Sequence, residues 1–302
     1  MLGALFGGSK WMDCFYVAFR IPNLLRDLFA EGALSQAFVT TFSKRSSEKG
    51  EDSAWQLAHR VMSLATIVVS GLILLGMLFS QQIVDLLLMA SADQQIWGQD
   101  ERELTILLVR IMYPFLLMVS LSALVMGMLN ARQIFGMPAL ASCFFNLGSM
   151  LGGGLLGWCF DPHWGKNSLI GISIGVLIGG MAQLCVQFPA LWKAGFRFRW
   201  DTHWRDEGVK KVLQLMGPAV IAASAVQVNV MVNSAFAIKA GPGAVSWLNW
   251  SFRLMQLPLG MFGVAVATVT LPALAKSCVA GVGENFAPTL NRGLNLVTVL
   301  VL

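Results

Sequence analysis

Charged residues are scarce in this chain of 302 residues. They make up 12% of it and hydrophobic residues 56%, whereas a soluble domain typically carries roughly 25% charged residues. A surface facing water needs more charge than this, so the composition excludes a soluble globular domain. The predicted fold class is an all-α membrane protein, a polytopic transmembrane helical bundle of about eight spans.

Residues suited to metal binding or covalent chemistry are equally sparse. His59, His163 and His203 lie far apart in loops, and the five cysteines form no CxxC or Cys/His cluster. The HExxH, GxSxG and P-loop motifs are absent. We therefore predict neither a zinc site nor a disulfide framework, expect buried free thiols and no cofactor, and do not expect an enzyme. A membrane-embedded glycosyltransferase or protease would need catalytic groups clustered inside the spans.

The apolar segments have the length that crosses a bilayer, about 20 residues. They lie at 12–42, interrupted at Pro22, then at 61–79 with an amphipathic extension to 88, 104–129, 138–160, 169–192, 212–238 and 245–271, and another begins near 286. The chain starts on a short apolar stub and stops inside an apolar run, so we expect a fragment. Small residues recur four apart and predict a close helix contact, either mobile or static: Gly148, Gly152, Gly171, Gly175 and Gly179.

Basic loop residues gather on one side of the predicted membrane. That side has Lys44, Arg45, Lys49, Arg60, Arg132, Lys193, Arg197, Arg199, Arg205, Lys210, Lys211 and Lys276. The other side has Arg102, Lys166 and Lys239, with a cluster of acidic residues near 93–103. The positive-inside rule makes the first side cytoplasmic. On that side, aromatic and basic residues in 199–214 predict a helix lying on the inner leaflet. Asp85 is predicted to be solvated.

A few ionisable side chains lie inside the spans. Ser246, Asn249 and Arg253 share one helical stripe with Gln256, Gly260 and Gly263, and Asp13, Arg20 and Asp27 share another. Arg26 lies four residues after Pro22, just past the bend that this proline is expected to introduce. An arginine at mid-membrane costs at least ~2.5 kcal/mol, so we predict that these side chains face the interior of the bundle. Inward arginines suit an anionic ligand, phosphate above all. The alternative for each is a salt bridge that only neutralises it.

Four stretches carry a resemblance to a known family. They are 13–38 (DCFYVAFRIPNLLRDLFAEGALSQAF), 114–146 (with GMLNARQIFGMPALASCFFN), 214–233 (QLMGPAVIAASAVQVNVMVN) and 245–276 (VSWLNWSFRLMQLPLGMFGVAVATVTLPALAK). Together they resemble the MurJ (MviN) family, the lipid II flippases of bacterial peptidoglycan synthesis.

This resemblance implies the multidrug/oligosaccharidyl-lipid/polysaccharide exporter fold and alternating access around a cationic cavity. The cargo would be lipid II, an undecaprenyl-pyrophosphate-linked precursor moved from the inner to the outer leaflet of the cytoplasmic membrane. Residues that match the family's functional positions are Arg26 of PNLLR, Arg253 of RLM, Asp13, Glu31 and Ser246 of VSW, and Asn249 joins them from its stripe.

The resemblance also implies which part of the family fold the chain covers and which partners it has. Residues 1–302 would be mostly the family's N-terminal half, seven full spans and a partial eighth, without the family's first helix and most of its second half. The expected partners are lipid II and membrane lipid but no nucleic acid, and we expect a monomer. The coupling ion stays open. The alternative cargo is a drug or another polyprenyl-linked oligosaccharide, carried by an exporter of the same superfamily.

Overall fold

The computed structural model of the chain describes residues 2–27, 34–89, 98–258, 260, 266 and 286–301, and none of these residues forms a β-strand. The chain divides into two compact units, residues 1–245 and 246–302. The first unit holds α1 (Leu2–Phe6), α2 (Lys10–Leu25), α3 (Ser35–Lys49), α4 (Glu51–Leu78), α5 (Ser80–Met89), α6 (Gln99–Met112), α7 (Phe115–Ala131), α8 (Gly136–Phe160), α9 (Ser168–Cys185), α10 (Phe188–Lys193) and α11 (Glu207–Lys239). Helix α12 (Ala244–Pro258) crosses the boundary, and α14 (Phe286–Val301) belongs to the second unit.

Five helical stretches within the described residues are long and apolar enough to cross a membrane. They are Glu51–Leu78, Gln99–Ala131, Gly136–Phe160, Ser168–Lys193 and Glu207–Lys239. Four of them contain a predicted span whole, and Glu51–Leu78 covers all but the last residue of the span predicted at 61–79, whose extension to 88 lies in the separate helix α5. The predicted first span is represented by α2 and α3, with residues 28–33 between them outside the described part. Most of 259–285 is also outside it, so the structure does not delimit the last two predicted spans.

The surface of the first unit is unusually apolar. Leu74 and Leu78 of α4 are 63% and 71% exposed, and Leu151 and Leu155 of α8 are each 65% exposed. So large an exposed apolar area would drive aggregation in water, whereas in a bilayer it faces lipid. The predicted fold class, a polytopic helical membrane bundle, is confirmed.

The cysteine prediction was only partly right. The four described cysteines are free thiols, as expected. Only Cys14 is buried, however, whereas Cys143, Cys159 and Cys185 are exposed. These three lie on helices whose outer faces contact lipid in a membrane, and a thiol behaves there as a small apolar group. An apolar run in a membrane protein therefore does not imply burial in protein.

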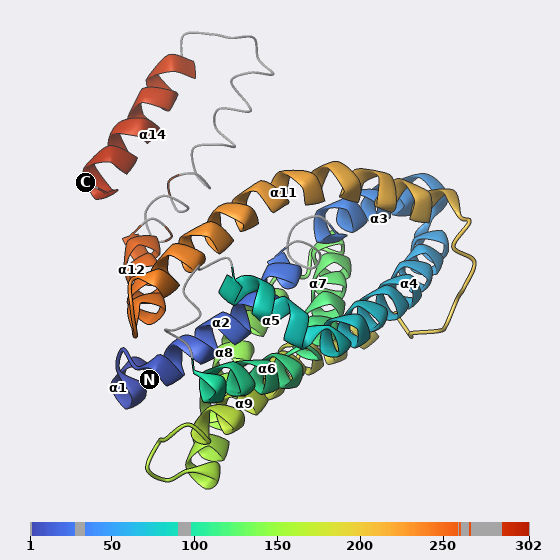
Figure 1. Ribbon diagram of the computed structural model, residues 1–302. Helices are drawn as coiled ribbons and strands as arrows, with labels where there is room; N and C mark the ends of the chain where they lie inside the picture. Colours follow the sequence, from blue (N-terminus) through green and yellow to red (C-terminus); the bar gives the residue numbers. More distant parts are fainter. Residues whose placement is uncertain are drawn as a thin grey trace. The chain divides into compact units, whose positions relative to one another are not determined.

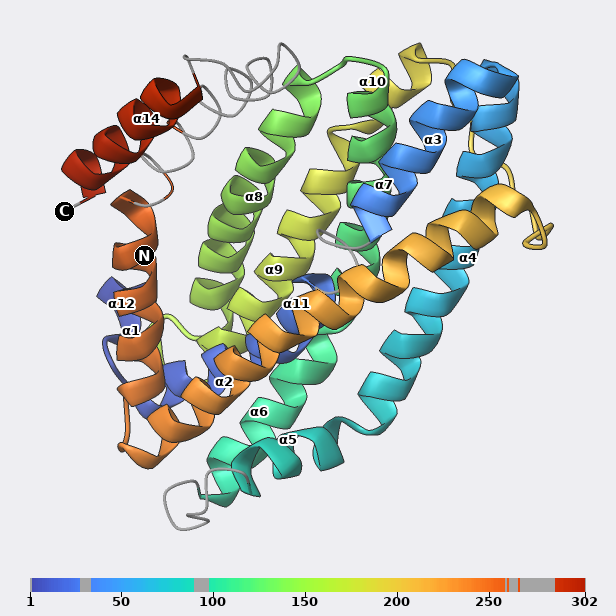
Figure 2. The same ribbon diagram turned by 90° about the horizontal axis from the view of Figure 1, so that it is seen from above.

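Helices α8 and α9 pack side by side with almost no space between their backbones (Figure 2). A Cβ placed on Gly175 would lie 2.3 Å from Cα of Gly153, and one on Gly171 would lie 2.4 Å from N of Gly157. No larger side chain fits at such distances, so glycine permits this approach. The predicted small-residue helix contact is confirmed as a packing contact between these two helices.

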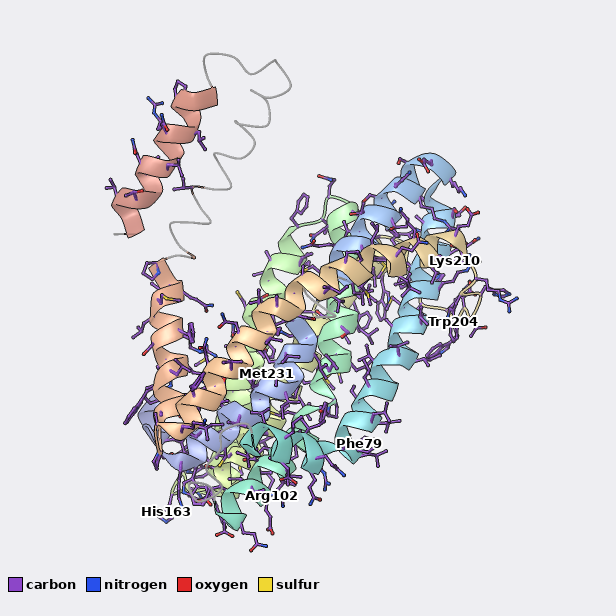
Figure 3. The ribbon with its side chains drawn as sticks, turned by 45° about the horizontal axis from the view of Figure 1, so that its top comes forward. Phe79, Arg102, His163, Trp204, Lys210 and Met231 are labelled. Carbon is purple, nitrogen blue, oxygen red and sulfur yellow. The ribbon has the colours of Figure 1, made fainter. Side chains whose placement is uncertain are left out.

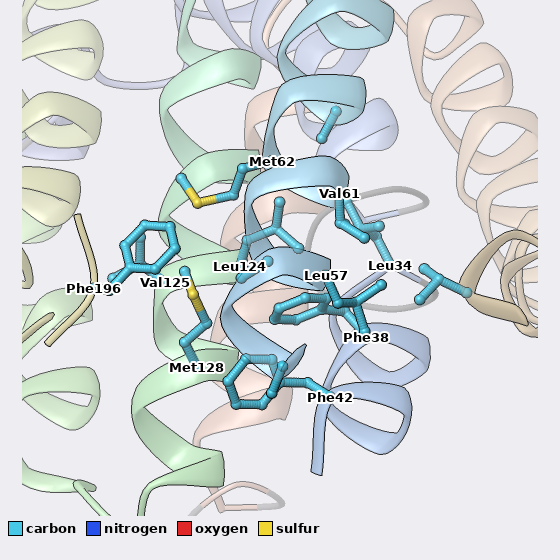
Figure 4. Close-up of a cluster of buried hydrophobic side chains, with 14 of the residues drawn as sticks. Leu34, Phe38, Phe42, Leu57, Val61, Met62, Leu124, Val125, Met128 and Phe196 are labelled. Atoms are coloured by element: carbon cyan, nitrogen blue, oxygen red, sulfur yellow. The ribbon is translucent and has the colours of Figure 1, made fainter. Parts of the chain in front are cut away.

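A hydrophobic cluster holds α3, α4 and α7 together (Figure 4). Phe38, Leu57, Leu124 and Met128 in this cluster are fully buried. Phe196, which follows α10, is 2% exposed and stacks on the ring of His59 at 4.7 Å between ring centroids. The cluster therefore joins the segment after α10 to the bundle at the end where α3 finishes and α4 begins.

The two ends of the first unit differ in charge as the loops predicted. Figure 3 places Trp204 and Lys210 at one end, and Arg102 and His163 at the other. At the first end Arg132 forms a salt bridge with Glu51, so the loops after α3 and α7 lie on the same side. At the second end Lys10 pairs with Glu101. The described basic loops thus gather at one end, which supports the predicted orientation.

Candidate functional site

The polar stripe predicted on the first span faces α11. The guanidinium of Arg20 donates through Nη1 to the carbonyl of Val230, at 3.2 Å. Asp27 accepts from Nε2 of Gln227, also at 3.2 Å. Seven residues separate Arg20 from Asp27, so both lie on one side of a helix. The structure thus confirms that this stripe points into a helix–helix contact and away from lipid.

Asp27 is the centre of a small hydrogen-bond cluster. Its Oδ1 accepts from Nη2 of Arg26 at 2.9 Å and from Nε at 3.2 Å. Its Oδ2 accepts from Nδ2 of Asn23 at 3.4 Å, in addition to Gln227. The side chains of Arg26 and Asp27 are 21% and 30% exposed. An arginine within the protein is thus held by an adjacent carboxylate, which keeps its charge compensated where water is scarce.

Asp13 lies near the other end of α2 from Arg26. It is 3% exposed, and its Oδ2 accepts a hydrogen bond of 2.6 Å from the backbone N–H of Gly243. Gly243 has a φ of +85° and Gly241 one of +114°, in the left-handed region that glycine tolerates. Asp13 therefore ties the start of α2 to the glycine turn that joins α11 to α12.

The remaining predicted site residues lie elsewhere. Ser246, Asn249 and Arg253 follow one another along α12 in the second unit, where Ser246 is buried, Asn249 is half-buried and Arg253 is exposed. Glu31 lies outside the described residues. The structure therefore groups the candidates into Arg26 and Asp13 on α2 and the three residues of α12.

Residues 194–206 form an irregular strap that contacts α3 and α4. Asp206 accepts from Nη1 of Arg45 at 2.5 Å and from Nη1 of Arg60 at 2.7 Å. Arg60 also donates through Nε to Asp201, at 2.9 Å. Asp206 is in addition the N-cap of α11, because its side chain accepts from the N–H of Gly208. One carboxylate thus both starts α11 and fastens it to two neighbouring helices.

These contacts shift the pKa values of both carboxyl groups. Burial acts to raise the pKa of Asp201, but hydrogen bonds from His203 and Arg60 outweigh it and lower the value to about 2. Burial likewise opposes the shift at Asp206, where hydrogen bonds from Arg45 and Gly208 hold the pKa below its ordinary value. Both groups are therefore carboxylates at neutral pH, as their arginine partners require.

One prediction was wrong. The segment 199–214 is not one helix on the membrane surface, because 194–206 is irregular and α11 begins only at Glu207. The carboxylates of Asp201 and Asp206 hold the strap against α4, and Asp206 sets the start of α11. The side chain of Asp85 is 29% exposed, in keeping with its predicted solvation, and it also accepts from Nε and Nη2 of Arg102 at 2.5 and 2.7 Å.

The set of predicted site residues contained neither Asn23 nor Gln227. Asn23 lies four residues before Asp27, on the same helix face, and this spacing was the signal that could have identified it. Gln227 forms a hydrogen bond from α11 to Asp27. Its partner is 200 positions away, and the spacing within one helix says nothing about such a partner.

The described residues contain no group of three or more side chains that could hold a metal ion. What they contain is a polar helix contact with two arginines between apolar membrane helices. Fold and site together define a polytopic helical membrane protein with charged groups between its helices.

Comparison with known proteins identifies the family. The family model described as lipid II flippase MurJ matches residues 2–302, so the chain belongs to the MurJ family. A probable lipid II flippase MurJ of Buchnera aphidicola subsp. Acyrthosiphon pisum is 31% identical over 100% of this chain and 57% of its own length. One of Vibrio cholerae is 35% identical over 98% of the chain and 56% of its own length. The lipid II flippase MurJ of Burkholderia cenocepacia is 33% identical over 99% and 57%.

A solved structure agrees on the fold. The lipid II flippase MurJ in an inward closed conformation superposes with a TM-score of 0.78 at 24% identity, over 98% of this chain and 58% of that one. The chain thus spans little more than half the length of the curated relatives that it matches. Family membership places it in the bacterial cytoplasmic membrane as a multi-pass protein. The positive-inside rule predicts that the end with the basic loops is the cytoplasmic end.

Proposed function

We propose that this chain takes part in flipping lipid II from the inner to the outer leaflet of the cytoplasmic membrane. The observation that supports this most directly is family membership over residues 2–302. The proposed process is transport without covalent chemistry, so we assign the chain no catalytic residue and no cofactor. Its proposed partners are lipid II and the surrounding membrane lipid, and it acts as a monomer.

The hydrogen-bond cluster around Asp27 suits such a cargo. Lipid II carries a pyrophosphate, and the planar fork of an arginine binds two phosphate oxygens at once. The fork of Arg26 contacts Asp27 through both Nε and Nη2. A pyrophosphate that replaced Asp27 as acceptor would keep the arginine paired throughout. This exchange keeps the charge of Arg26 compensated, while Asp27 retains the hydrogen bonds that the amides of Asn23 and Gln227 donate to its Oδ2.

We further propose that Arg253, Ser246, Asn249, Asp13 and Glu31 contribute to the same transport cycle, Arg253 as a second phosphate ligand. Asp13 has a distinct part, because it holds Gly243 and thereby the turn that leads into α12. Helix α12 carries Ser246, Asn249 and Arg253. In this scheme Asp13 holds the turn from which the helix of the second arginine starts.

Alternating access is the mechanism we propose. The contacts of Arg20 with Val230 and of Asp27 with Gln227 join α2 to α11 by one hydrogen bond each. Single hydrogen bonds between membrane helices contribute about 0.6 kcal/mol on average. Bonds this weak separate easily, so a cargo that binds one arrangement more tightly can shift the populations of the two.

A reconstitution assay tests the proposal. The chain is inserted into liposomes with fluorescent lipid II, and a membrane-impermeant quencher reports how fast the label crosses. We expect faster crossing with the chain than in empty liposomes. A different polyprenyl-pyrophosphate oligosaccharide and a cationic drug are measured in parallel. If lipid II does not move, the proposal is wrong. If the drug or the other oligosaccharide moves instead, the chain is an exporter of that cargo.

A further inference from the structure

A basic recess lies between α3 and the beginning of α11, apart from the cluster around Asp27. Its volume is about 570 Å³. The lining residues are Thr40, Thr41, Lys44, Arg45, Glu48 and Lys49 from α3, and Arg205, Asp206, Glu207, Gly208, Lys211 and Leu215 from the strap and α11. We call it the α3–α11 recess. Figures 1 and 2 agree that α3 lies alongside the first turns of α11.

The recess has more basic than acidic side chains in its lining, so its ion pairs do not compensate every positive charge. Arg45 is bound to Asp206, which also binds Arg60. Lys44 lies 3.7 Å from Glu48. Three basic lining residues are exposed and form no salt bridge within the described part of the chain: Lys49, Arg205 and Lys211. Among the acidic lining residues, Glu207 is also exposed and without a salt bridge to a described residue. The lining therefore carries a positive excess that no described side chain compensates.

Residues typical of a membrane interface lie near the recess. It is at the end with the basic loops, where Trp192 and Trp200 are 55% and 62% exposed, and exposed tryptophans collect at membrane interfaces. Leu215 lines the recess one helical turn after Lys211 and is 38% exposed. Three turns farther along the same face of α11, Val226 is 61% exposed. The basic lining thus gives way to an apolar helix face.

We propose that the α3–α11 recess binds an anionic phospholipid of the inner leaflet. Its phosphate contacts Lys49, Arg205 and Lys211, and its acyl chains lie along the exposed face of α11 beyond Leu215. Basic pockets between membrane helices on the cytoplasmic side are suited to anionic headgroups, and arginine binds phosphate with two donors. A zwitterionic headgroup has no net charge to match the excess. The site is independent of the cargo and of the proposed function.

Lipid titration of the purified chain, followed by native mass spectrometry, tests this site. The probes are phosphatidylglycerol, phosphatidylcholine and soluble glycerol 3-phosphate. We expect phosphatidylglycerol to bind more tightly than phosphatidylcholine, and glycerol 3-phosphate not to displace it. In the variant K49Q/R205Q/K211Q, the affinity for phosphatidylglycerol should fall about tenfold or more, as the loss of three cations near the surface predicts.

The matched control removes the same charge from the same end of the protein. It is K193Q/R197Q/K210Q, whose residues lie outside the recess, and we expect its affinity to stay within about twofold of the parent because exposed charges beyond contact are screened. Equal losses in both variants would show general surface charge and overturn the site. Equal binding of phosphatidylcholine, or displacement by glycerol 3-phosphate, would overturn the anionic lipid as ligand. Should the triple variant fail to fold, K211Q alone must still weaken binding more than K210Q does.

Discussion

The contact between α8 and α9 yields the sharpest prediction for stability. In the change Gly175→Ala, the new methyl would lie 2.3 Å from both Cα and N of Gly153 and 3.0 Å from the carbonyl of Ser149. Ordinary contact begins at 3.4 Å. The helices must therefore separate by at least about 1 Å, since backbone atoms have no alternative rotamer. A gap of this size forfeits a quarter to a half of each dispersion contact along the pair.

The expected cost of this separation is about 2 kcal/mol, in the range of about 1–3 kcal/mol found for overpacked cores. The matched control is Gly71→Ala in α4, because a Cβ there meets nothing within 4 Å. Alanine is the better helix former by up to about 1 kcal/mol, so the control should gain stability while Gly175→Ala loses it.

Thermal unfolding in detergent, followed by circular dichroism, measures both variants against the parent. We expect the midpoint to fall for Gly175→Ala and to stay or rise for Gly71→Ala. If the two alanine variants unfold at the same temperature, α8 and α9 do not approach as closely as the structure shows. The argument from glycine would then be refuted.

Two further predictions concern the contacts of α11 and the strap. Gln227→Leu removes the donor to Asp27 and should lower the thermal midpoint by the equivalent of about 0.6 kcal/mol. The control is the exposed Gln214→Leu, and equal midpoints for the two variants would contradict this prediction. Asp201 has a pKa of about 2 against an ordinary 3.8, so its contribution to stability is complete above about pH 4 and is lost as the pH falls through about 2. Protease cleavage within 194–206 should rise over that interval in the parent and less in D201N, and identical pH profiles would exclude Asp201 as the cause.

Much of the fold was predictable because a membrane imposes simple constraints. The span length predicted the five apolar helices, and the bias of basic loops predicted which ends lie together. The contact between Arg132 and Glu51 bears out the second point. The glycine spacing predicted a close helix contact, although not that α8 and α9 form it.

The partners across the bundle were not predictable from one sequence. Asp27 is bonded to Gln227 and Asp13 to Gly243, at separations of 200 and 230 residues. Periodicity shows which face of a helix is polar, but not which other helix contacts it. The prediction of a surface helix in the strap failed for a similar reason. Its aromatic and basic residues have the pattern of an interfacial helix, but Arg60, 141 positions from Asp201, holds the segment in an irregular conformation.

Transport by arginine variants tests the central claim, that Arg26 and Arg253 bind the cargo's phosphates. Arg26→Ala and Arg253→Ala are compared with Arg197→Ala at the cytoplasmic surface, in liposomes with fluorescent lipid II and equal amounts of inserted protein. A hydrogen bond to a charged group contributes about 1.5–3 kcal/mol, so we predict that each of the first two variants slows lipid II movement about 10- to 100-fold. Arg197→Ala should move it at the parent rate. Normal movement of lipid II by Arg26→Ala or by Arg253→Ala would contradict the account.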